Sequence, residues 1–407
     1  MSPQLTIQPF PSADNEPIAR ALELADVPAT VEVLQALLAR HATRRDAEGG
    51  CPKAERDALR ASGLLALSIP VELGGLGGSW ADTLDVVRRL AQVDSSVAHL
   101  FAFHHLMLIT VVLYAQPAQW RPWLLGTARH DWFWGNALNP RDRRARWTAS
   151  GMGWLLSGPK SFCSGALDSE MLVASGEHEG RLLVAAIPTD RSGIAVHQDW
   201  DNMGQRQTDS GSVQFDRVWV DEAELLRDPG PLSTPRSCLR SLVSQLILVA
   251  IYIGLGEGAL SAARDYVRHE ARPWPLDGVA RVEQDPYVLA HLGDFHVALE
   301  GARLLAERAG RQLDAALERG DALRAEERGE LAIQIATAKV AAARAGLDVC
   351  HRLFEVTGAR STHAALGLDR YWRNLRTHTL HDPLDHKVRE IGEWVLTERW
   401  PQPGFYA

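Results

Sequence analysis

The spacing of hydrophobic residues divides the chain into three parts. Up to about residue 128, apolar residues recur with helical spacing, as in VEVLQALLARHATRR (31–45). The segment SSVAHLFAFHHLMLITVVLY (95–114) is apolar on nearly all sides, so we expect a buried helix there, with its N-cap within Asp94-Ser95-Ser96. These patterns predict an N-terminal α-helical domain over residues 1–128.

The middle of the chain has short β-rich segments that are typical of strands. WLLSGPKSFCSGA (154–166), MLVASGEHEGRLLVAAIP (171–188) and GSVQFDRVWV (211–220) are rich in Val, Ile, Phe and Trp and are separated by Gly, Asp and Ser turns. No helix-length segment follows any of them, which disfavours parallel βαβ units. We therefore predict an antiparallel β-barrel or sandwich over residues 129–235.

Helical periodicity returns over residues 236–407. The chain has four long helical patterns with short connections, at 245–274, 285–320, 329–359 and 385–400. Long helices joined by short loops pack as antiparallel neighbours, so a C-terminal four-helix bundle is predicted. The fold class is then α+β, with the order helices, strands, helical bundle.

Composition and charge exclude several classes of protein. With 407 residues, 46% of them hydrophobic, and a net charge of −8, the chain is typical of globular proteins and lacks the basic balance of a nucleic-acid binder. No apolar run suits a membrane span, and residues 1–17 lack the pattern of a signal peptide. Four scattered cysteines form no disulfide framework. We expect a cytoplasmic protein that binds neither membrane nor nucleic acid.

Two histidines near the C-terminus are candidates for chemistry. In RNLRTHTLHDPLDHK (373–387), His378 and His381 are three residues apart, and Pro383 places them at or just beyond a helix end. A metal site needs a third ligand, and the stretch has neither HExxH nor Glu-x-x-His. The pattern therefore favours side chains at the edge of an active site over a metal centre.

Other polar residues stand in contexts that allow a functional or a structural role. His104 and His105 interrupt the apolar helix, and because they are about 100° apart, only one is expected to face a given site; a hydrogen-bonded core histidine is the other interpretation. The chain also has Asn136, Cys163 and Ser164 at strand ends, Arg272 and Arg360 near helix ends, and the glycine-rich stretch GGLGG (74–78). That stretch lacks the Lys-Ser/Thr of a phosphate-binding loop, so we interpret it as a tight turn.

The order of these segments resembles the acyl-CoA dehydrogenase superfamily over nearly the whole chain. The resemblance is carried by DNMGQRQTDSGSVQFDRVWV (201–220) and FEVTGARSTHAALGLDRYWRNLR (354–376). Members that dehydrogenate acyl-CoA use a glutamate, commonly before Gly-Thr, where this chain reads THTLHDP (377–383). With WFWGNALNP (132–140) and KSFCSGA (160–166), this departure resembles the flavin-dependent monooxygenases of the superfamily.

That resemblance implies a two-component enzyme. It would take FMNH2, rather than FAD, from a separate NAD(P)H:flavin reductase, form a flavin C4a-hydroperoxide with O2, and oxygenate a small organosulfur substrate. It also implies a homotetramer. By the same resemblance His104, His381 and Ser164 would be catalytic, and cofactor-binding residues would be Asn136, Cys163, Ser164, Arg272, Gly358 and Arg360. An acyl-CoA dehydrogenase, a nitroalkane-type oxidase and a non-enzymatic flavin-binding protein remain the alternatives.

Overall fold

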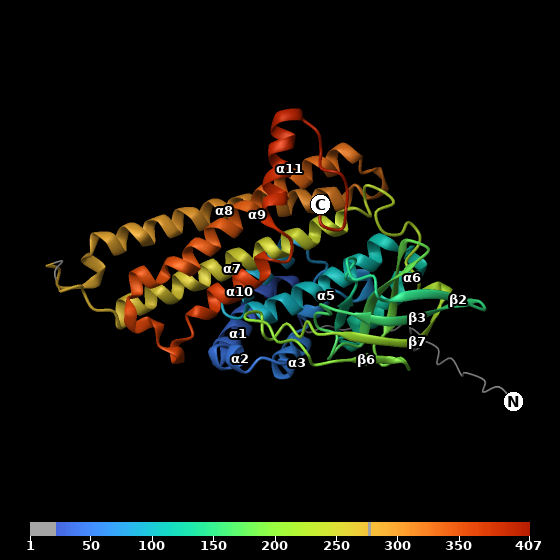
Figure 1. Cartoon of the computed structure of the whole chain (residues 1–407), viewed down its shortest axis with the longest axis horizontal. Helices are drawn as coiled ribbons and strands as arrows, with labels where there is room; N and C mark the ends of the chain where they lie inside the picture. Colours follow the sequence, from blue (N-terminus) through green and yellow to red (C-terminus); the bar gives the residue numbers. More distant parts are fainter. Residues whose placement is uncertain (1–21, 276–277) are drawn as a thin grey trace.

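The computed structural model describes residues 22–275 and 278–407, and it begins with a layer of helices (Figure 1). These are α1 (Val27–Ala39), α2 (Ala42–Glu48), α3 (Lys53–Ala61), α4 (Trp80–Ala91), α5 (Ser95–Tyr114) and α6 (Pro117–His130). Asp94, the first residue of the predicted N-cap region 94–96, caps α5, because its carboxylate accepts hydrogen bonds from the backbone N–H groups of Ser96 and Val97, both at 3.1 Å. The glycine-rich stretch is the expected tight turn, since a Cβ on Gly75 would lie 2.0 Å from the carbonyl oxygen of Ile69.

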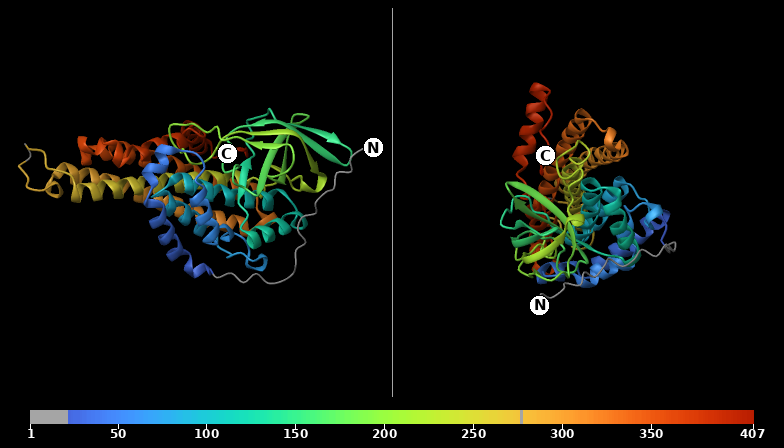
Figure 2. Two further views of the ribbon diagram at one scale, coloured as in Figure 1. Left: turned by 90° about the horizontal axis from the view of Figure 1, so that it is seen from below. Right: turned by 90° about the vertical axis from the view of Figure 1, so that its right-hand side faces the viewer.

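Seven strands form one curled sheet at one end of the molecule (Figure 2). They are β1 (Trp134–Ala137), β2 (Arg146–Ser150), β3 (Gly153–Lys160), β4 (Met171–His178), β5 (Arg181–Pro188), β6 (Ile194–Val196) and β7 (Val213–Asp221). Most pairs are antiparallel, as predicted, but β4 pairs in parallel with β1 and, at Arg146 and Glu177, with β2. The β2–β3 hairpin and the loop after it lie between β1 and β4, and they give the chain the length that a parallel return requires.

The C-terminal helices form the predicted bundle, with one difference. They are α7 (Leu239–His269), α8 (Pro286–Glu318), α9 (Ala325–Thr357), α10 (Asp369–Thr379) and α11 (Leu384–Thr397). Helix α10 packs against both α7 and α9, whereas α11, which we expected as the fourth helix, packs mainly on α9 and projects from the bundle (Figure 1). Helix α10 has 11 residues, three of them arginine, and is shorter than the four helical patterns from which the bundle was predicted.

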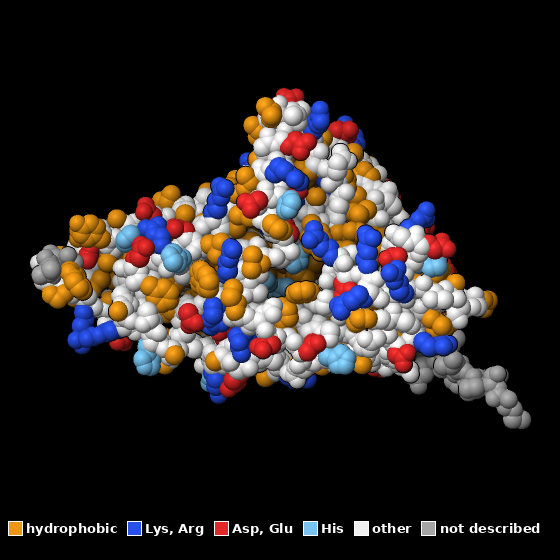
Figure 3. All heavy atoms as spheres, viewed as in Figure 1, with side chains coloured by type: hydrophobic (Ala, Val, Ile, Leu, Met, Phe, Trp, Pro, Cys, Tyr) orange, Lys and Arg blue, Asp and Glu red, His pale blue; other side chains and the backbone are white. Residues whose placement is uncertain are grey.

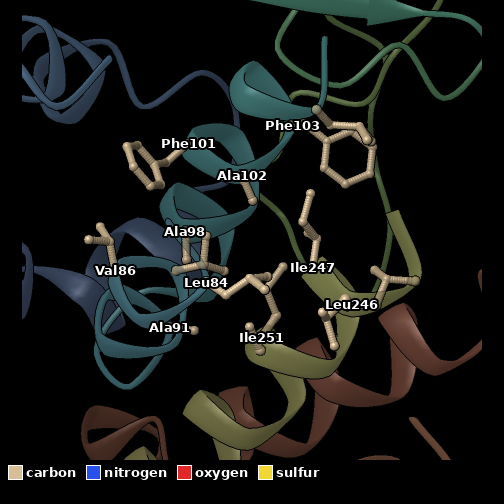
Figure 4. Close-up of a cluster of buried hydrophobic side chains, with 14 of the residues drawn as sticks. Leu84, Val86, Ala91, Ala98, Phe101, Ala102, Phe103, Leu246, Ile247 and Ile251 are labelled. Atoms are coloured by element: carbon tan, nitrogen blue, oxygen red, sulfur yellow. The ribbon is translucent and has the colours of Figure 1, made fainter. Parts of the chain in front are cut away.

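Helices α5 and α7 lie in the core, where their side chains interdigitate with those of α4 (Figure 4). Both are long and apolar enough to cross a bilayer. However, 89% of the most apolar 18-residue stretch of α5 and 78% of that of α7 are buried within the protein, as in core helices. The predicted absence of a signal peptide concerns residues 1–17, which lie outside the described residues. The predicted domain boundaries at 128/129 and 235/236 stay predictions; the last N-terminal helix ends at His130 and the bundle begins at Leu239.

Candidate active site

A cavity of about 630 Å³ lies where α5, α7, the end of α10 and the loops of the β region meet. Figure 3 shows a hollow near the centre of the face in view, between the bundle and the β region. The described residues that line this cavity include three histidines and two arginines but no aspartate or glutamate. The cavity therefore combines an apolar wall with basic and neutral polar groups, and the described part of the chain contributes no acidic side chain to it.

Two of the histidines join a chain of hydrogen bonds along the wall. His378, in the last turn of α10, contacts His99 of α5 through Nε2 and Nδ1, at 3.0 Å. The Nε2 atom of His99 lies 2.9 Å from the hydroxyl of Ser164, which lies 2.7 Å from the hydroxyl of Ser210. The chain thus connects α10, α5 and two loops of the β region.

The contacts allow this chain to run in either of two directions. The hydroxyl of Thr208 contacts the Gln205 carbonyl at 3.0 Å and the Ser210 hydroxyl at 2.8 Å, and the Ser210 hydroxyl also contacts the Thr208 carbonyl at 3.4 Å. In both directions each ring and hydroxyl between His378 and Ser210 accepts one hydrogen bond and donates one. In a neutral ring, Nδ1 of His378 carries the lone pair in one direction and the proton in the other.

Burial keeps both rings uncharged. Burial lowers the pKa of His378 to about 3, and burial together with the neighbouring histidines lowers the pKa of His99 well below its usual range. The buried Nδ1 atom of His378 has no hydrogen-bond partner within the part of the chain that the structure describes. Such an atom is a polar group with which a bound molecule can form a hydrogen bond.

The third histidine, His381, lies at the mouth of the cavity. Its side chain is 37% exposed, and its Nδ1 atom lies 3.0 Å from Oδ1 of Asp382. The same oxygen accepts a hydrogen bond from the buried ammonium of Lys339 at 2.6 Å. Burial raises the pKa of Asp382, but His381 and Lys339 outweigh that effect and hold the pKa well below its usual range. The carboxylate is therefore ionised, and it fixes His381 with Nε2 free to meet a ligand.

Two residues predicted for the site, Asn136 and Ser164, do line the cavity. The backbone N–H of Asn136 donates to the carbonyl of Ser164 at 3.0 Å, and its side-chain oxygen accepts from the N–H of Leu138 at 3.0 Å. These bonds hold β1 beside the loop that carries Ser164. The amide nitrogen of Asn136 remains available to a ligand.

Comparison with known proteins places this architecture in a family. The acyl-CoA dehydrogenase N-terminal domain model matches residues 28–131, and the C-terminal domain model matches residues 246–386. The chain is 59% identical to the probable FMNH2-dependent monooxygenase SfnC of Pseudomonas putida, over 91% of this chain and 94% of that protein. The chain belongs to the flavin-dependent monooxygenase branch of the acyl-CoA dehydrogenase superfamily.

Solved structures of this monooxygenase branch have the same fold. Methanesulfinate monooxygenase MsuC from Pseudomonas fluorescens has a TM-score of 0.92 and 60% identity, covering 93% of this chain and 99% of that one. FMN-bound TdsC from Paenibacillus sp. A11-2 has a TM-score of 0.89 and 38% identity, with the same coverage. The predicted fold class and family are thereby confirmed.

The structure corrects the position expected for His104. Its Nε2 atom donates to the Leu65 carbonyl at 2.8 Å, and its Nδ1 atom accepts from the N–H of Trp134 at 3.2 Å, so both nitrogens are used within the core. His105 is also buried, with Nδ1 at 2.7 Å from the hydroxyl of Ser68. Neither ring lines the cavity. In this monooxygenase, the α5 histidine that lines the cavity is His99.

The sequence held a signal for His99 that the interpretation missed. His99 and Phe103 are four residues apart on α5, and both line the cavity together with Leu106. His104 lies about 100° away from Phe103 around the helix axis, and therefore points elsewhere. Because α5 is apolar on nearly all sides, its pattern alone does not identify the stripe that faces a cavity.

The remaining predicted cofactor residues do not reach this cavity within one chain. Cys163 is 1% exposed in the core of the β region, and burial raises the pKa of its thiol to about 12, so Ser164 rather than Cys163 faces the site. Arg272, Gly358 and Arg360 are exposed and follow the ends of α7 and α9, at the far end of the bundle (Figure 1). Gly358 has a φ of 75°, which favours glycine.

Proposed function

We propose that this protein is a two-component FMNH2-dependent monooxygenase that transfers one atom of O2 to the sulfur of a small organosulfur substrate. The relatives with the highest identities described above are named as monooxygenases of this kind. The observation that carries the proposal is the cavity itself, in which three imidazoles and several hydroxyls meet without a carboxylate among the described lining residues. The overall reaction converts substrate, O2 and FMNH2 into oxygenated substrate, FMN and water.

The residues of the cavity fit a flavin. Its volume of about 630 Å³ lies within the range of cofactor pockets. The unpartnered Nδ1 of His378, the hydroxyl of Ser164 and the amide of Asn136 would hold the ring system. Bound reduced FMN would supply the two electrons that split O2. FMN rather than FAD is the cofactor supported by the relatives that bind or depend on it.

The side chains around the cavity would control protons and water. The chain from His378 through His99 to Ser164 consists of neutral groups, so no strong acid stands next to the reacting atoms. His381, oriented by Asp382, would hold or deliver a proton at Nε2. Phe103 and other apolar side chains of the wall would exclude bulk water from the reaction.

The alternative reactions need a group that the cavity lacks. An acyl-CoA dehydrogenase or a nitroalkane-type oxidase removes a carbon-bound proton with a carboxylate base. No aspartate or glutamate is present among the described residues that line the cavity, and Asp382 is engaged by Lys339 and His381. A non-enzymatic flavin-binding protein would have no requirement for the hydrogen-bond chain.

We also propose that the active enzyme is a homotetramer. Arg272 and Arg360 are exposed at the end of the bundle that is distant from the cavity, so they can bind the flavin phosphate only if another copy of the chain brings them to it. Exposed apolar side chains on α8 would suit such a contact, namely Tyr287, Leu289, Val297 and Leu304. A separate NAD(P)H:flavin reductase would deliver FMNH2, and we place the reaction in the cytoplasm, where NAD(P)H is available.

A coupling assay tests the proposal. Wild-type enzyme, FMN, NADH, a generic flavin reductase and a panel of organosulfur compounds are incubated in air, and oxygenated product and H2O2 are both quantified. We expect at least one compound to be oxygenated, and we expect His381→Ala to shift the yield from product to H2O2. Anaerobic bleaching of FMN-loaded enzyme by an acyl-CoA, without oxygenation of any sulfur compound, would contradict the proposal.

A further inference from the structure

Arg240 is a buried cation that has no carboxylate partner among residues 22–275 and 278–407. It lies in the first turn of α7, is 6% exposed, and lines the cavity. Its Nε–H donates to the hydroxyl of Thr110 at 3.3 Å, and that hydroxyl in turn donates to the carbonyl of Leu106 at 2.6 Å. Within the described residues, the two terminal nitrogens of the guanidinium have no hydrogen-bond partner.

Burial of an unpaired charge is unfavourable, so its retention needs a reason. Burial lowers the pKa of Arg240, and the other titratable groups that influence it are the phenols of Tyr114 and Tyr406, which are neutral at physiological pH. Arginine nevertheless stays protonated in proteins. A second arginine, Arg141, lines the same cavity, and Lys and Arg side chains are visible beside the hollow in Figure 3. The positive charge is local, because the whole chain has a net charge of −8.

The surroundings of Arg240 define a subsite with two kinds of surface. Ser244 lies one turn further along α7, on the same face; it is 6% exposed, lines the cavity, and its hydroxyl has no partner among the described residues. The N-terminal end of a helix adds positive potential. Phe103 and Leu106 of α5 supply an apolar wall of the same cavity. A small molecule with an oxyanion head and a short hydrocarbon group matches this combination.

We propose that Arg240, with Ser244, binds the oxyanion of the substrate, and that the substrate class is a small organic sulfinate rather than a neutral sulfide, sulfone or thiophene. This inference rests on the proposed function and names its substrate class. In the reaction a sulfinate, O2 and FMNH2 give a sulfonate, FMN and water. The sulfur lone pair forms the new S–O bond, the O–O bond breaks, and the second oxygen leaves as water with two protons.

Equilibrium binding tests the assignment without relying on turnover. Methanesulfinate and neutral dimethyl sulfone are titrated calorimetrically into the full-length protein loaded with oxidised FMN. The variants are Arg240→Gln, Arg240→Lys and, as a matched control, Arg264→Gln, which removes an exposed charge from the same helix. We expect Arg240→Gln to weaken methanesulfinate binding at least about tenfold, Arg240→Lys to weaken it less, and Arg264→Gln to leave it unchanged. Dimethyl sulfone should bind equally to all four proteins.

The same variants distinguish the substrate from the other oxyanion in the system, the flavin phosphate. FMN and riboflavin are titrated into each protein. If Arg240→Gln weakens FMN but not riboflavin, Arg240 binds the phosphate and the inference is wrong; it is also wrong if methanesulfinate binds the wild type and Arg240→Gln equally. The ligand-free thermal midpoint of Arg240→Gln should equal or exceed that of the wild type, because a buried unpaired charge has been removed. Failure of the proposed function would look different, since the wild type would then oxygenate no sulfur compound at all.

Discussion

Replacing Asp382 with asparagine separates the charge of the carboxylate from its shape. The ammonium of Lys339 is 1% exposed and has two oxygen partners, Asp382 and Gln245, each at 2.6 Å. In Asp382→Asn the amide oxygen can still accept a hydrogen bond, but the lysine becomes a buried cation without a negative partner. Breaking a buried ion pair on one side costs about 3–5 kcal/mol.

The expected loss lies at the lower end of that range. The remaining hydrogen bonds of Lys339 offset part of the cost. Burial already lowers the pKa of Lys339, so the lysine of the variant can also release its proton, and each unit by which the pKa is lowered reduces the cost of keeping a buried charge by about 1.4 kcal/mol. A loss of about 3 kcal/mol corresponds to a fall in Tm of about 6–12 °C for a domain the size of the bundle. The fall is measured by circular dichroism at pH 7, above the unfolded pKa of aspartate.

The double variant Asp382→Asn/Lys339→Met is the control. It removes both charges, so it should recover most of the lost stability while His381 still lacks its carboxylate. Product coupling should therefore stay low in the double variant, although Tm recovers. The reasoning is refuted if the single variant loses less than about 1 kcal/mol, or if coupling returns together with stability.

The remaining predictions concern the histidines of α5 and α10, the dependence of stability on pH, and the phosphate site. His104→Ala should lower the free energy of unfolding by about 2–4 kcal/mol without altering the ratio of product to H2O2. His99→Ala should raise the yield of H2O2 at the expense of product. A lower ratio of product to H2O2 in His104→Ala would show that His104 belongs to the active site after all. The free energy of unfolding, measured in urea, should fall as the pH is lowered from 7 to 5, by about 2 kcal/mol for His104 and by the same amount for His378. Each histidine has a folded pKa of about 3 and therefore takes up a proton on unfolding. The stabilisation is fully present above the unfolded pKa of about 6.5 and is lost as the pH falls below it. His104→Phe should remove one of these two contributions. Arg360→Ala should weaken FMNH2 binding at least about tenfold in a protein that light scattering reports as a tetramer, and an unchanged affinity would remove Arg360 from the phosphate site.

The large-scale architecture could be predicted because each element has its own hydrophobic period. Helical spacing, strand alternation and a second helical region were sufficient for the α+β order, and Pro383 correctly placed His378 and His381 at the end of a helix. The parallel β1–β4 pair was not predictable in this way, because it depends on how distant strands meet. The place of α10 in the bundle was not predictable either, because the segment is short and polar and its position depends on packing against α7 and α9.

The candidate site residues were predicted mainly from the family resemblance. Ser164, Asn136 and His381 line the cavity, and their roles in binding or catalysis stay predictions. In α5 every position is apolar or buried, so the sequence gives no contrast between His99 and His104. Arg240 was missed because an arginine near a helix start has many ordinary surface roles. Only the tertiary structure shows that its guanidinium is buried without a carboxylate.

The central claim is that the carboxylate-free cavity transfers one atom of O2 to sulfur. The most direct measurement is mass spectrometry of the product formed by wild-type enzyme, FMN, NADH and flavin reductase with an organosulfur substrate under 18O2, and in parallel in H218O under ordinary O2. The account predicts one labelled oxygen atom from 18O2 and none from labelled water. Label from water alone, or no incorporation into any sulfur compound while O2 is consumed, would contradict it.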